Sequence, residues 1–410
     1  MHNVHAKNTV RYYVLIAVVL AFLFFSNDFG LIDVQKTAIV MAAGIDREGE
    51  DFIVTSQIAI PQSSTQGKAT QAVQIVSRGK TVAEAFDEIN AKTGWYPKLV
   101  FCKLILFGKQ AAQENTFDAL DYFLWDEYLT DDCLIAVCEG TAKEVLNASA
   151  LVDPSSSVAI GKVLSTHAER VGTVLTSSLR EFAIGYFGDS KSAFLPVVKM
   201  EKQQEPLSGE AAQTAAQGGG EQSGQDSQNG GQGKSGESEQ NKPVFSASET
   251  ALFVRGKWID TLTAEETFAY SVVKNKLQLA PYSVKTDEQV CTLNFKHNAP
   301  KISLKVGKEG RGNVTIHLTV TAGILDYSQA LPLEDISDAG DVPDGVFYAA
   351  EKKLSGEIHS VYEKARACGC DIFGVQDLLV KKGKRSAYKY KDSILTNSTL
   401  TVSVRFQNLR

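Results

Sequence analysis

Asn313–Thr321, with the sequence Asn-Val-Thr-Ile-His-Leu-Thr-Val-Thr, is the most regular stretch of the chain and decides its class of fold. Its apolar residues alternate with threonine and histidine, which predicts a β-strand with one buried face. Lys301–Val306 precedes it across a glycine-containing turn, and Thr399–Phe406 alternates in the same way. Between them, Ala349–Ala367 has apolar residues at helical spacing. These elements predict an antiparallel sheet with a helix packed on it, which is an α+β unit.

The residues after Leu31 predict another unit of the same kind. Thr37–Asp46 and Asp51–Pro61 have the pattern of two strands around a short turn, and Thr81–Lys92 has one apolar helical face ended by Gly94. Further elements are expected at Val73–Ser77 (strand), Leu99–Phe107 (strand), Gln113–Tyr128 (helix), Leu134–Cys138 (strand) and Thr141–Asn147 (helix).

The clearest boundary in the sequence is Glu201–Lys242, which contains nine glycines and nine glutamines. Such a segment cannot bury enough apolar surface to offset its ordering entropy, so it is predicted to be disordered. Phe194–Met200 and Thr250–Trp258 read as strands on either side of it, so the segment is either an insertion in a hairpin or a tether between domains. Helices are expected before and after these strands, at Asp153–Phe187 and Glu265–Lys276.

Together these patterns predict three consecutive mixed α+β domains with antiparallel-rich sheets, behind an N-terminal membrane segment. The predicted parts are residues 1–30 (a cytoplasmic tail and signal or signal-anchor segment), 31–150, 151–272 with the disordered insertion 201–243, and 273–410.

The predicted membrane segment is the uncharged run Tyr12–Phe25, which includes Leu15 and Leu20 and follows Lys7 and Arg11. Positive charge before the run predicts an inside N-terminus and an exported remainder. The run is shorter than the about 20 residues of a clean span and fits the about 7–15 residues of a signal-peptide core. No small-residue cleavage site follows it, which favours a retained anchor over a cleaved signal or a buried core helix.

The overall composition is that of a globular protein. The 410 residues are 43% hydrophobic and 22% charged, with a net charge of −6, which gives no reason to expect nucleic acid as a partner. Six cysteines are too few for a disulfide scaffold at this length. Cys102 and Cys133 lie in apolar runs and are expected to be buried.

No catalytic motif is complete in this sequence. Gly79-Lys80-Thr81 lacks the earlier glycine of a phosphate loop, and the histidines are scattered without metal-ligand spacing. Cys368-Gly369-Cys370 is either a redox or soft-metal site or a buried cysteine followed by a helix-ending glycine. We therefore predict no catalytic, cofactor-binding or metal-binding residues.

The basic segment Lys381–Lys391 is a candidate contact surface. It holds six basic residues interleaved with two tyrosines, and it fits either contact with anionic lipid or a partner protein, or an ordinary solvated loop. Its basic residues are Lys381, Lys382, Lys384, Arg385, Lys389 and Lys391.

Several segments, in their order and spacing, make the chain resemble the Ger(x)C family, the C subunits of nutrient germinant receptors in spore-forming bacteria. They are Ala42-Ala43-Gly44-Ile45-Asp46 with its following strand, helix Thr81–Lys92 leading to Leu99–Phe107, Ala251–Trp258 with Thr263–Thr267, and helix Ala349–Ala367 leading to Cys370-Asp371-Ile372-Phe373-Gly374. The resemblance covers nearly the whole chain after Leu31.

The resemblance implies a three-domain protein on the outer face of the spore inner membrane, beside multi-pass membrane subunits of the receptor. It implies no catalytic residues, no cofactor and no direct small-molecule substrate. The chain departs from the family pattern in two ways: it lacks the lipid-attachment cysteine at the end of the signal, and it carries the Gln/Gly-rich insertion.

The predicted function is therefore that of a non-enzymatic, membrane-attached subunit that supports the assembly or signalling of its membrane partners during germination. Two alternatives from other classes are an exported cell-envelope enzyme with a dispersed site and a solute-binding protein of a transporter.

Overall fold

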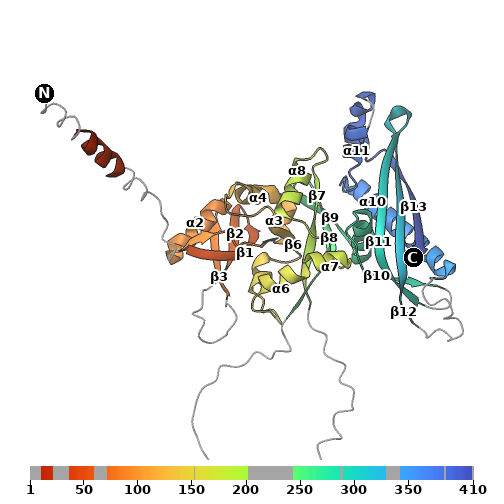
Figure 1. The fold of residues 1–410 in the computed structure, drawn as a ribbon, viewed down its shortest axis with the longest axis horizontal. Helices are drawn as coiled ribbons and strands as arrows, with labels where there is room; N and C mark the ends of the chain where they lie inside the picture. The colour runs from red at the N-terminus through yellow and green to blue at the C-terminus, as the bar shows by residue number, and fades with distance from the viewer. Residues whose placement is uncertain are drawn as a thin grey trace, which may run out of the picture.

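The structure is a computed structural model that describes residues 11–21, 37–59, 72–151, 153–201, 243–286, 290–328, 342–382 and 385–408. Its described residues form a mixed α+β fold with two sheets (Figure 1), as the sequence predicts. Residues 11–21 form a separate helix.

The first sheet has nine strands in the order β3-β2-β1-β5-β6-β7-β8-β9, with β4 paired to β1. Strands β1, β4, β5, β6 and β7 are parallel to one another, and antiparallel hairpins extend both sides of this centre. The bounds are β1 (Thr37–Glu48), β2 (Asp51–Ala59), β3 (Ala72–Gly79), β4 (Tyr96–Lys98), β5 (Leu104–Phe107), β6 (Leu134–Cys138), β7 (Ser192–Glu201), β8 (Val244–Val254) and β9 (Lys257–Leu262).

Helices cover both faces of this sheet, which explains why β5 is apolar at every position. Ile105 and Phe107 pack with helices α2, α3, α4 and α8, whereas Leu104 and Leu106 pack with α5 and α6 on the other face. The bounds are α2 (Val82–Thr93), α3 (Lys109–Glu114), α4 (Thr116–Trp125), α5 (Ala142–Asn147), α6 (Ser156–Val163), α7 (Thr166–Arg170) and α8 (Leu179–Phe187).

Three predicted elements of this part are shorter than expected. The strand expected from Leu99 begins only at Leu104, because Leu99–Cys102 forms a turn closed by the Cys102 N–H to the Leu99 carbonyl at 2.8 Å. The helix expected over Gln113–Tyr128 is split at Asn115, whose extended backbone and side chain cap α4. Asp153–Phe187 holds three short helices, each beginning after a capping serine: Ser155, Ser165 and Ser178.

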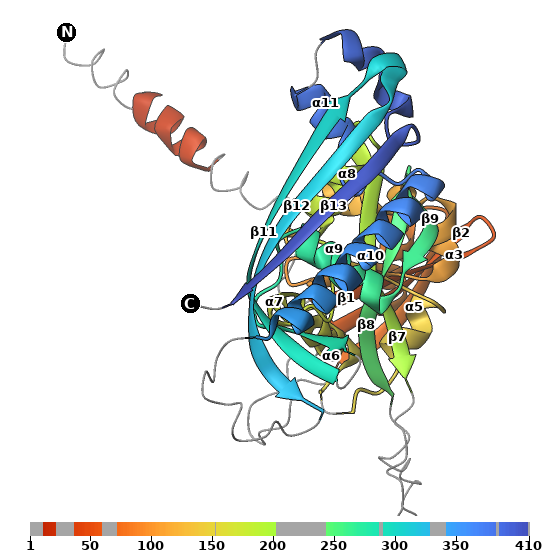
Figure 2. The ribbon, with the colours of Figure 1, turned by 90° about the vertical axis from the view of Figure 1, so that its right-hand side faces the viewer.

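The second sheet has the order β10-β11-β12-β13 and packs against the long helix α10 (Figure 2). The predicted apolar face of α10 is buried at Leu354, Ile358, Val361 and Ala365. The bounds are α9 (Ala264–Val273), β10 (Ala280–Lys285), β11 (Val290–Val306), η3 (Lys308–Gly310), β12 (Gly312–Tyr327), α10 (Asp344–Cys368), α11 (Val375–Lys382), η5 (Arg385–Ser393) and β13 (Ser398–Asn408).

The expectation of a wholly antiparallel second sheet is wrong at its last strand. β13 is parallel to β12, with Gly312 opposite Ser398 and Ala322 opposite Asn408. The physical reason is the crossover through α10 and α11, which returns the chain to the end of the sheet where β12 begins.

The segment rich in Gln and Gly is an insertion in a hairpin. β7 pairs antiparallel with β8, and Glu201 lies opposite Val244. Residues 202–242 lie outside the described residues, and so does the prediction that they are disordered. Strands from the predicted ranges 31–150 and 151–272 join in the first sheet. The domain boundary expected at residue 150 stays a prediction.

Candidate functional site

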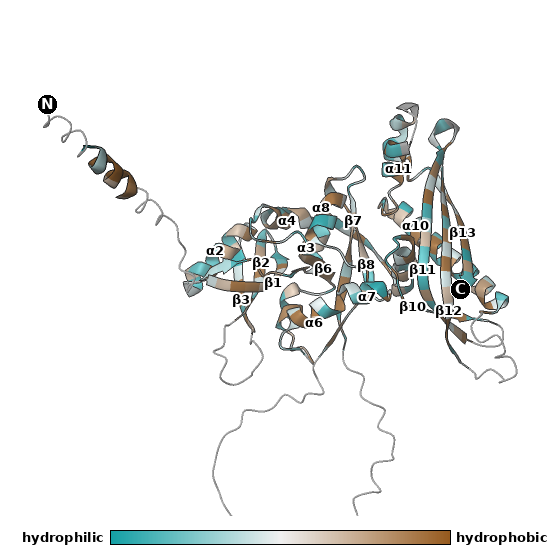
Figure 3. Cartoon of the chain, in the orientation of Figure 1, coloured by the Kyte–Doolittle hydropathy of each residue, from teal (hydrophilic) through white to brown (hydrophobic). Residues whose placement is uncertain are grey.

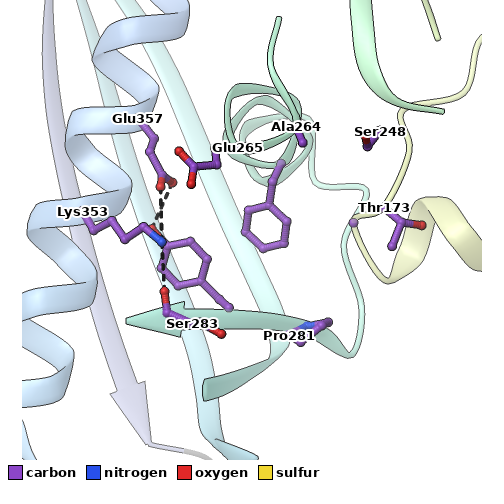
Figure 4. A pocket seen from close by; sticks show the side chains of 11 residues that line it. Thr173, Ser248, Ala264, Glu265, Pro281, Ser283, Lys353 and Glu357 are labelled. Carbon is purple, nitrogen blue, oxygen red and sulfur yellow. Dashed lines mark hydrogen bonds and ion pairs between the residues drawn. The ribbon is translucent and has the colours of Figure 1, made fainter. Parts of the chain in front are cut away.

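A pocket of about 320 Å³ lies between α9, β10 and α10, and it brings together polar groups from distant parts of the chain (Figure 4). Glu265 comes from the first turn of α9, and Tyr282 and Ser283 from β10. Lys353 and Glu357 lie one turn apart on α10, because residues four apart share one face of a helix.

Lys353, Glu357 and Tyr282 of this pocket interact with one another. The Tyr282 hydroxyl donates to Glu357 Oε2 at 3.0 Å, and Lys353 Nζ lies 3.7 Å from Glu357 Oε1. Lys353 Nζ also donates to the Ser283 carbonyl at 2.9 Å and lies 4.7 Å from the centre of the Tyr282 ring. Burial raises the pKa of the Glu357 carboxyl above its usual range. The pKa of Tyr282 is also raised, mainly by burial and to a smaller extent by the nearby charge of Glu357.

The wall of the pocket is aromatic. Phe268 stacks on Tyr282 with ring centres 5.3 Å apart and planes 11° from parallel. The pocket therefore offers an apolar surface, an exposed carboxylate at Glu265 and the paired Glu357. It can hold a small group with one positive end, but no histidine or cysteine is among the described residues that line it.

Two larger cavities contain buried aspartates that cap helices. Asp46 lines a cavity of about 490 Å³ and accepts from the N–H groups of Ala142 and Lys143 at 2.7 and 2.9 Å. Asp371 lines one of about 440 Å³ and accepts from Val375 and Gln376 at 2.8 and 2.7 Å. Burial raises the pKa of both carboxyls, although these hydrogen bonds act in the opposite direction. Both carboxylate oxygens of each aspartate thus accept hydrogen bonds from the start of a helix and stabilise the fold.

The Cys368-Gly369-Cys370 pair lies where α10 ends. Gly369 adopts a left-handed conformation (φ 73°) and ends the helix, as one of the two interpretations expected. Cys370 is buried and its Sγ contacts the Phe253 carbonyl at 3.3 Å, whereas Cys368 is half-buried. The hydrogen bond between the two thiols lowers the pKa of Cys368 to about 7. Among the described residues, no group of three potential ligands could hold a metal ion.

The predicted basic segment is distributed over α11 and η5. Lys381 and Lys389 are exposed, and Lys389 Nζ lies 4.8 Å from the centre of the Tyr390 ring. Lys391 instead forms an ion pair with Asp189 at 2.6 Å, which ties η5 to the residues before β7. Lys382 and Arg385 belong to these helices, whereas Lys384 lies outside the described residues. A role of the segment in lipid or partner contact stays a prediction.

The predicted anchor is described only over residues 11–21, which form a mainly hydrophobic helix (Figure 3). Tyr12, Leu15 and Leu20 are 70%, 61% and 61% exposed, and Phe25 lies outside the described residues. Across the parts of the chain that the structure describes, no helix has the length and apolar character needed to cross a bilayer.

Sequence reasoning missed the pocket of Figure 4 because Tyr282 and Glu357 are 75 positions apart. The only local signal is the pair Lys353 and Glu357, whose spacing of four residues is common on exposed helix faces. Cys102 and Cys133 are buried, as predicted.

Comparisons with known proteins point in one direction. A family model described as the N-terminal domain of spore germination proteins matches residues 31–200, and one described as spore germination B3/GerAC-like, C-terminal, matches residues 248–408. A solved structure described as the crystal structure of the GerBC protein shares the fold with a TM-score of 0.52 and 16% identity. That match covers 89% of this chain and 96% of the other. No curated protein matches the chain.

Proposed function

The chain belongs to the GerAC family of spore germination proteins, and we propose that it is a non-enzymatic, membrane-attached subunit of a spore nutrient germinant receptor. In this proposal it supports the assembly or signalling of multi-pass membrane subunits, from the outer face of the spore inner membrane.

One observation carries the proposal. The two family domains follow each other in order and together span residues 31–200 and 248–408, which include both sheets of the structure except the end of the β7–β8 hairpin. What lies between them, residues 201–247, is mostly the hairpin insertion, so the chain adds little of its own to the family architecture.

The polar groups in the cavities support a non-enzymatic role. General acid–base or nucleophilic catalysis needs a titratable group free to reach a substrate. Glu357 is held by Tyr282 and Lys353, and the carboxylates of Asp46 and Asp371 are occupied by backbone N–H groups. These groups have structural partners, which favours a role in binding and assembly.

Attachment to the membrane is supported by the helix of residues 11–21, whose large apolar side chains are exposed. Contact with a partner protein is supported by exposed Lys381 and Lys389 on α11 and η5. Such charges at the rim of an interface mainly set the rate and specificity of association.

Co-purification tests the proposal. Inner membranes from dormant spores that carry a tagged full-length chain should yield a multi-pass membrane protein encoded beside it. A strain without the chain should lose germination with one nutrient and keep it with others. Normal germination with every nutrient would contradict a receptor role, and recovery of the chain without any membrane protein would contradict the assembly role.

A further inference from the structure

Six large apolar side chains are exposed in the connections that lead into the first sheet, and we call this set the aromatic edge. A single exposed apolar residue is ordinary, whereas a cluster of this size indicates a contact surface. Its members, with their exposed fractions, are Trp95 (45%), Tyr96 (43%), Val100 (41%), Phe101 (58%), Trp125 (80%) and Tyr128 (53%).

The topology brings these residues to one side of the sheet. β4 and then β5 pair in parallel with β1, from Thr37 and from Ala42, and β6 starts opposite β5, so the connections before these strands approach the sheet from the same direction. Val100 and Phe101 lie in the turn before β5, and Tyr128 lies in the loop before β6. Lys98 Nζ lies 4.7 Å from the centre of the Tyr128 ring, which joins the two connections directly.

The aromatic edge is held in place by its own hydrogen bonds. Asp126 Oδ1 accepts from the N–H groups of Tyr128 and Leu129, both at 2.9 Å, so the loop after α4 has a defined turn. The Trp125 indole N–H donates to Asp121 Oδ1 at 3.1 Å. The rings are thus presented outward on a fixed support.

The same edge is where the chain enters the domain from its apolar N-terminal segment. Thr37, the first residue of β1, lies opposite Tyr96 in the parallel β1–β4 pair. Sixteen peptide units join Thr37 to the helix of residues 11–21, and they can span at most roughly 55 Å. An N-terminal segment inserted in a bilayer therefore keeps this edge within reach of the membrane surface.

The chemistry of the edge fits the interface between lipid and water. Tryptophan and tyrosine are enriched at that level of membrane proteins because each ring has an apolar body and a polar group. The nearby charges are mainly acidic, although Lys103 lies 3.8 Å from Asp132. The basic residues are Lys98 and Lys103, and the acidic ones are Asp121, Asp126, Glu127, Asp131 and Asp132. This balance favours a zwitterionic headgroup over an anionic one.

We propose that the aromatic edge lies in the headgroup region of the bilayer that holds the N-terminal segment. This inference rests on the membrane attachment in the proposed function, and it adds which surface meets the lipid. The amino-terminal end of β1 and helix α11 lie at opposite ends of the molecule (Figure 1). The basic residues of α11 and η5 are then directed to a protein partner and not to the same membrane surface.

The tryptophans of the chain provide the test. Of its three, Trp95 and Trp125 belong to the aromatic edge. The third, Trp258, is half-buried on β9 and donates to the Asp260 carbonyl at 3.0 Å, so it serves as an internal control. The full-length chain is reconstituted into phosphatidylcholine vesicles with or without bromine on the acyl chains, because bromine quenches tryptophan only at short range.

Bromine should lower the emission of the wild-type chain at least twofold, and Trp95→Phe/Trp125→Phe should remove most of that quenching. The single variants Trp95→Phe and Trp125→Phe should each remove part of it. Equal quenching of the wild-type chain and the double variant, with both floating with the vesicles, would overturn the proposal. Failure of the wild-type chain to float would overturn membrane attachment as well. Normal germination of a strain without the chain would contradict the receptor role but would not change the quenching result.

Discussion

Glu266 on α9 and Lys364 on α10 form an ion pair 2.5 Å long that joins the helix after the first sheet to the long helix of the second. The pair is largely shielded from solvent, with 11% and 26% of the two side chains exposed. Ser360 donates to Glu266 Oε1 at 2.8 Å, and the Thr263 N–H donates to Oε2 at 2.9 Å. The carboxylate thus links a helix cap to a contact between the two sheets.

Glu266→Gln should lower the free energy of unfolding by about 2–3 kcal/mol, because Lys364 would keep its charge in a shielded site with the Thr261 carbonyl but no carboxylate as partner. The double variant with Lys364→Met should be less destabilised than the sum of the two single variants, with a coupling of about 1–3 kcal/mol. Urea unfolding measures all three. Glu265→Gln, the same change at the neighbouring exposed residue, is the control, and equal losses at the two positions would argue against the pair.

The same pair should make stability depend on pH. Burial would raise the pKa of Glu266, but the hydrogen bonds from Lys364, Thr263 and Ser360 outweigh it and hold the pKa below its usual range. A carboxyl with a lowered folded-state pKa stabilises the fold above its unfolded-state pKa, and this contribution is lost as pH falls through the folded-state pKa. The stability difference between wild type and Glu266→Gln should therefore be largest near pH 7 and shrink in acid. A constant difference would show that the charge of Glu266 is not what stabilises the contact.

Sequence patterns predicted the elements whose period is regular and local. The last part of β11, Lys301–Val306, and most of β12 and α10 were predicted in this way, whereas residues 290–300 of β11 were not. The hairpin around the insertion was one of two interpretations that the flanking strands allowed. The central parallel strands were not predicted as such, because β5 is buried on both faces and its continuous apolar run shows no period. The direction of β13 depends on the path of α10, which no local pattern encodes.

The candidate contacts were less predictable, because they join residues that lie far apart in the sequence. Lys391 was expected in a free basic segment, but its partner Asp189 is 202 positions away. The aromatic edge combines residues of three separate connections, and only the parallel order of the strands brings them to one side. Such sites depend on the topology of the sheet.

The hairpin allows a direct test of the insertion. Because Glu201 lies opposite Val244, replacing residues 202–243 by Asn-Gly should leave a two-residue turn between paired strands. Shortening the loop from 42 residues to 2 should raise the free energy of unfolding by about 1–3 kcal/mol through a smaller closure entropy. Thermal melting should stay cooperative, and a glycine–serine segment of the original length should melt like the wild type. Loss of cooperative melting in the short variant alone would show that the insertion takes part in the fold.

The core of the second unit depends on α10. Ile358→Asp should lower the free energy of unfolding by more than about 3 kcal/mol, because Ile358 is fully buried among apolar residues and an aspartate there would have no partner. Lys352→Asp, which introduces the same residue on the exposed side of the helix, should cost less than about 1 kcal/mol. Denaturant unfolding compares the two variants. Similar losses of unfolding free energy would show that Ile358 is not part of the core.

The buried aspartates of the two family segments stabilise helix ends. Asp46 ends the segment Ala42–Asp46 and caps α5, and Asp371 follows Cys370 and caps α11. Asp46→Ala should lower the free energy of unfolding by about 2 kcal/mol, because the N–H groups of Ala142 and Lys143 at the start of α5 lose their acceptor. Asp87→Ala on the exposed face of α2 is the control and should change stability by less than about 0.5 kcal/mol.

The pH dependence of Asp46 should have the opposite sign to that of Glu266. Burial raises the pKa of Asp46 above its unfolded-state value, so the folded chain binds this proton more tightly than the unfolded chain. The contribution of Asp46 to stability should then decrease as pH rises through these two pKa values. Asp46→Asn keeps one acceptor and removes the titration, so its stability relative to the wild type should improve as pH rises from about 4 to 7. A difference that moves the other way would mean that the backbone hydrogen bonds outweigh burial at this carboxylate.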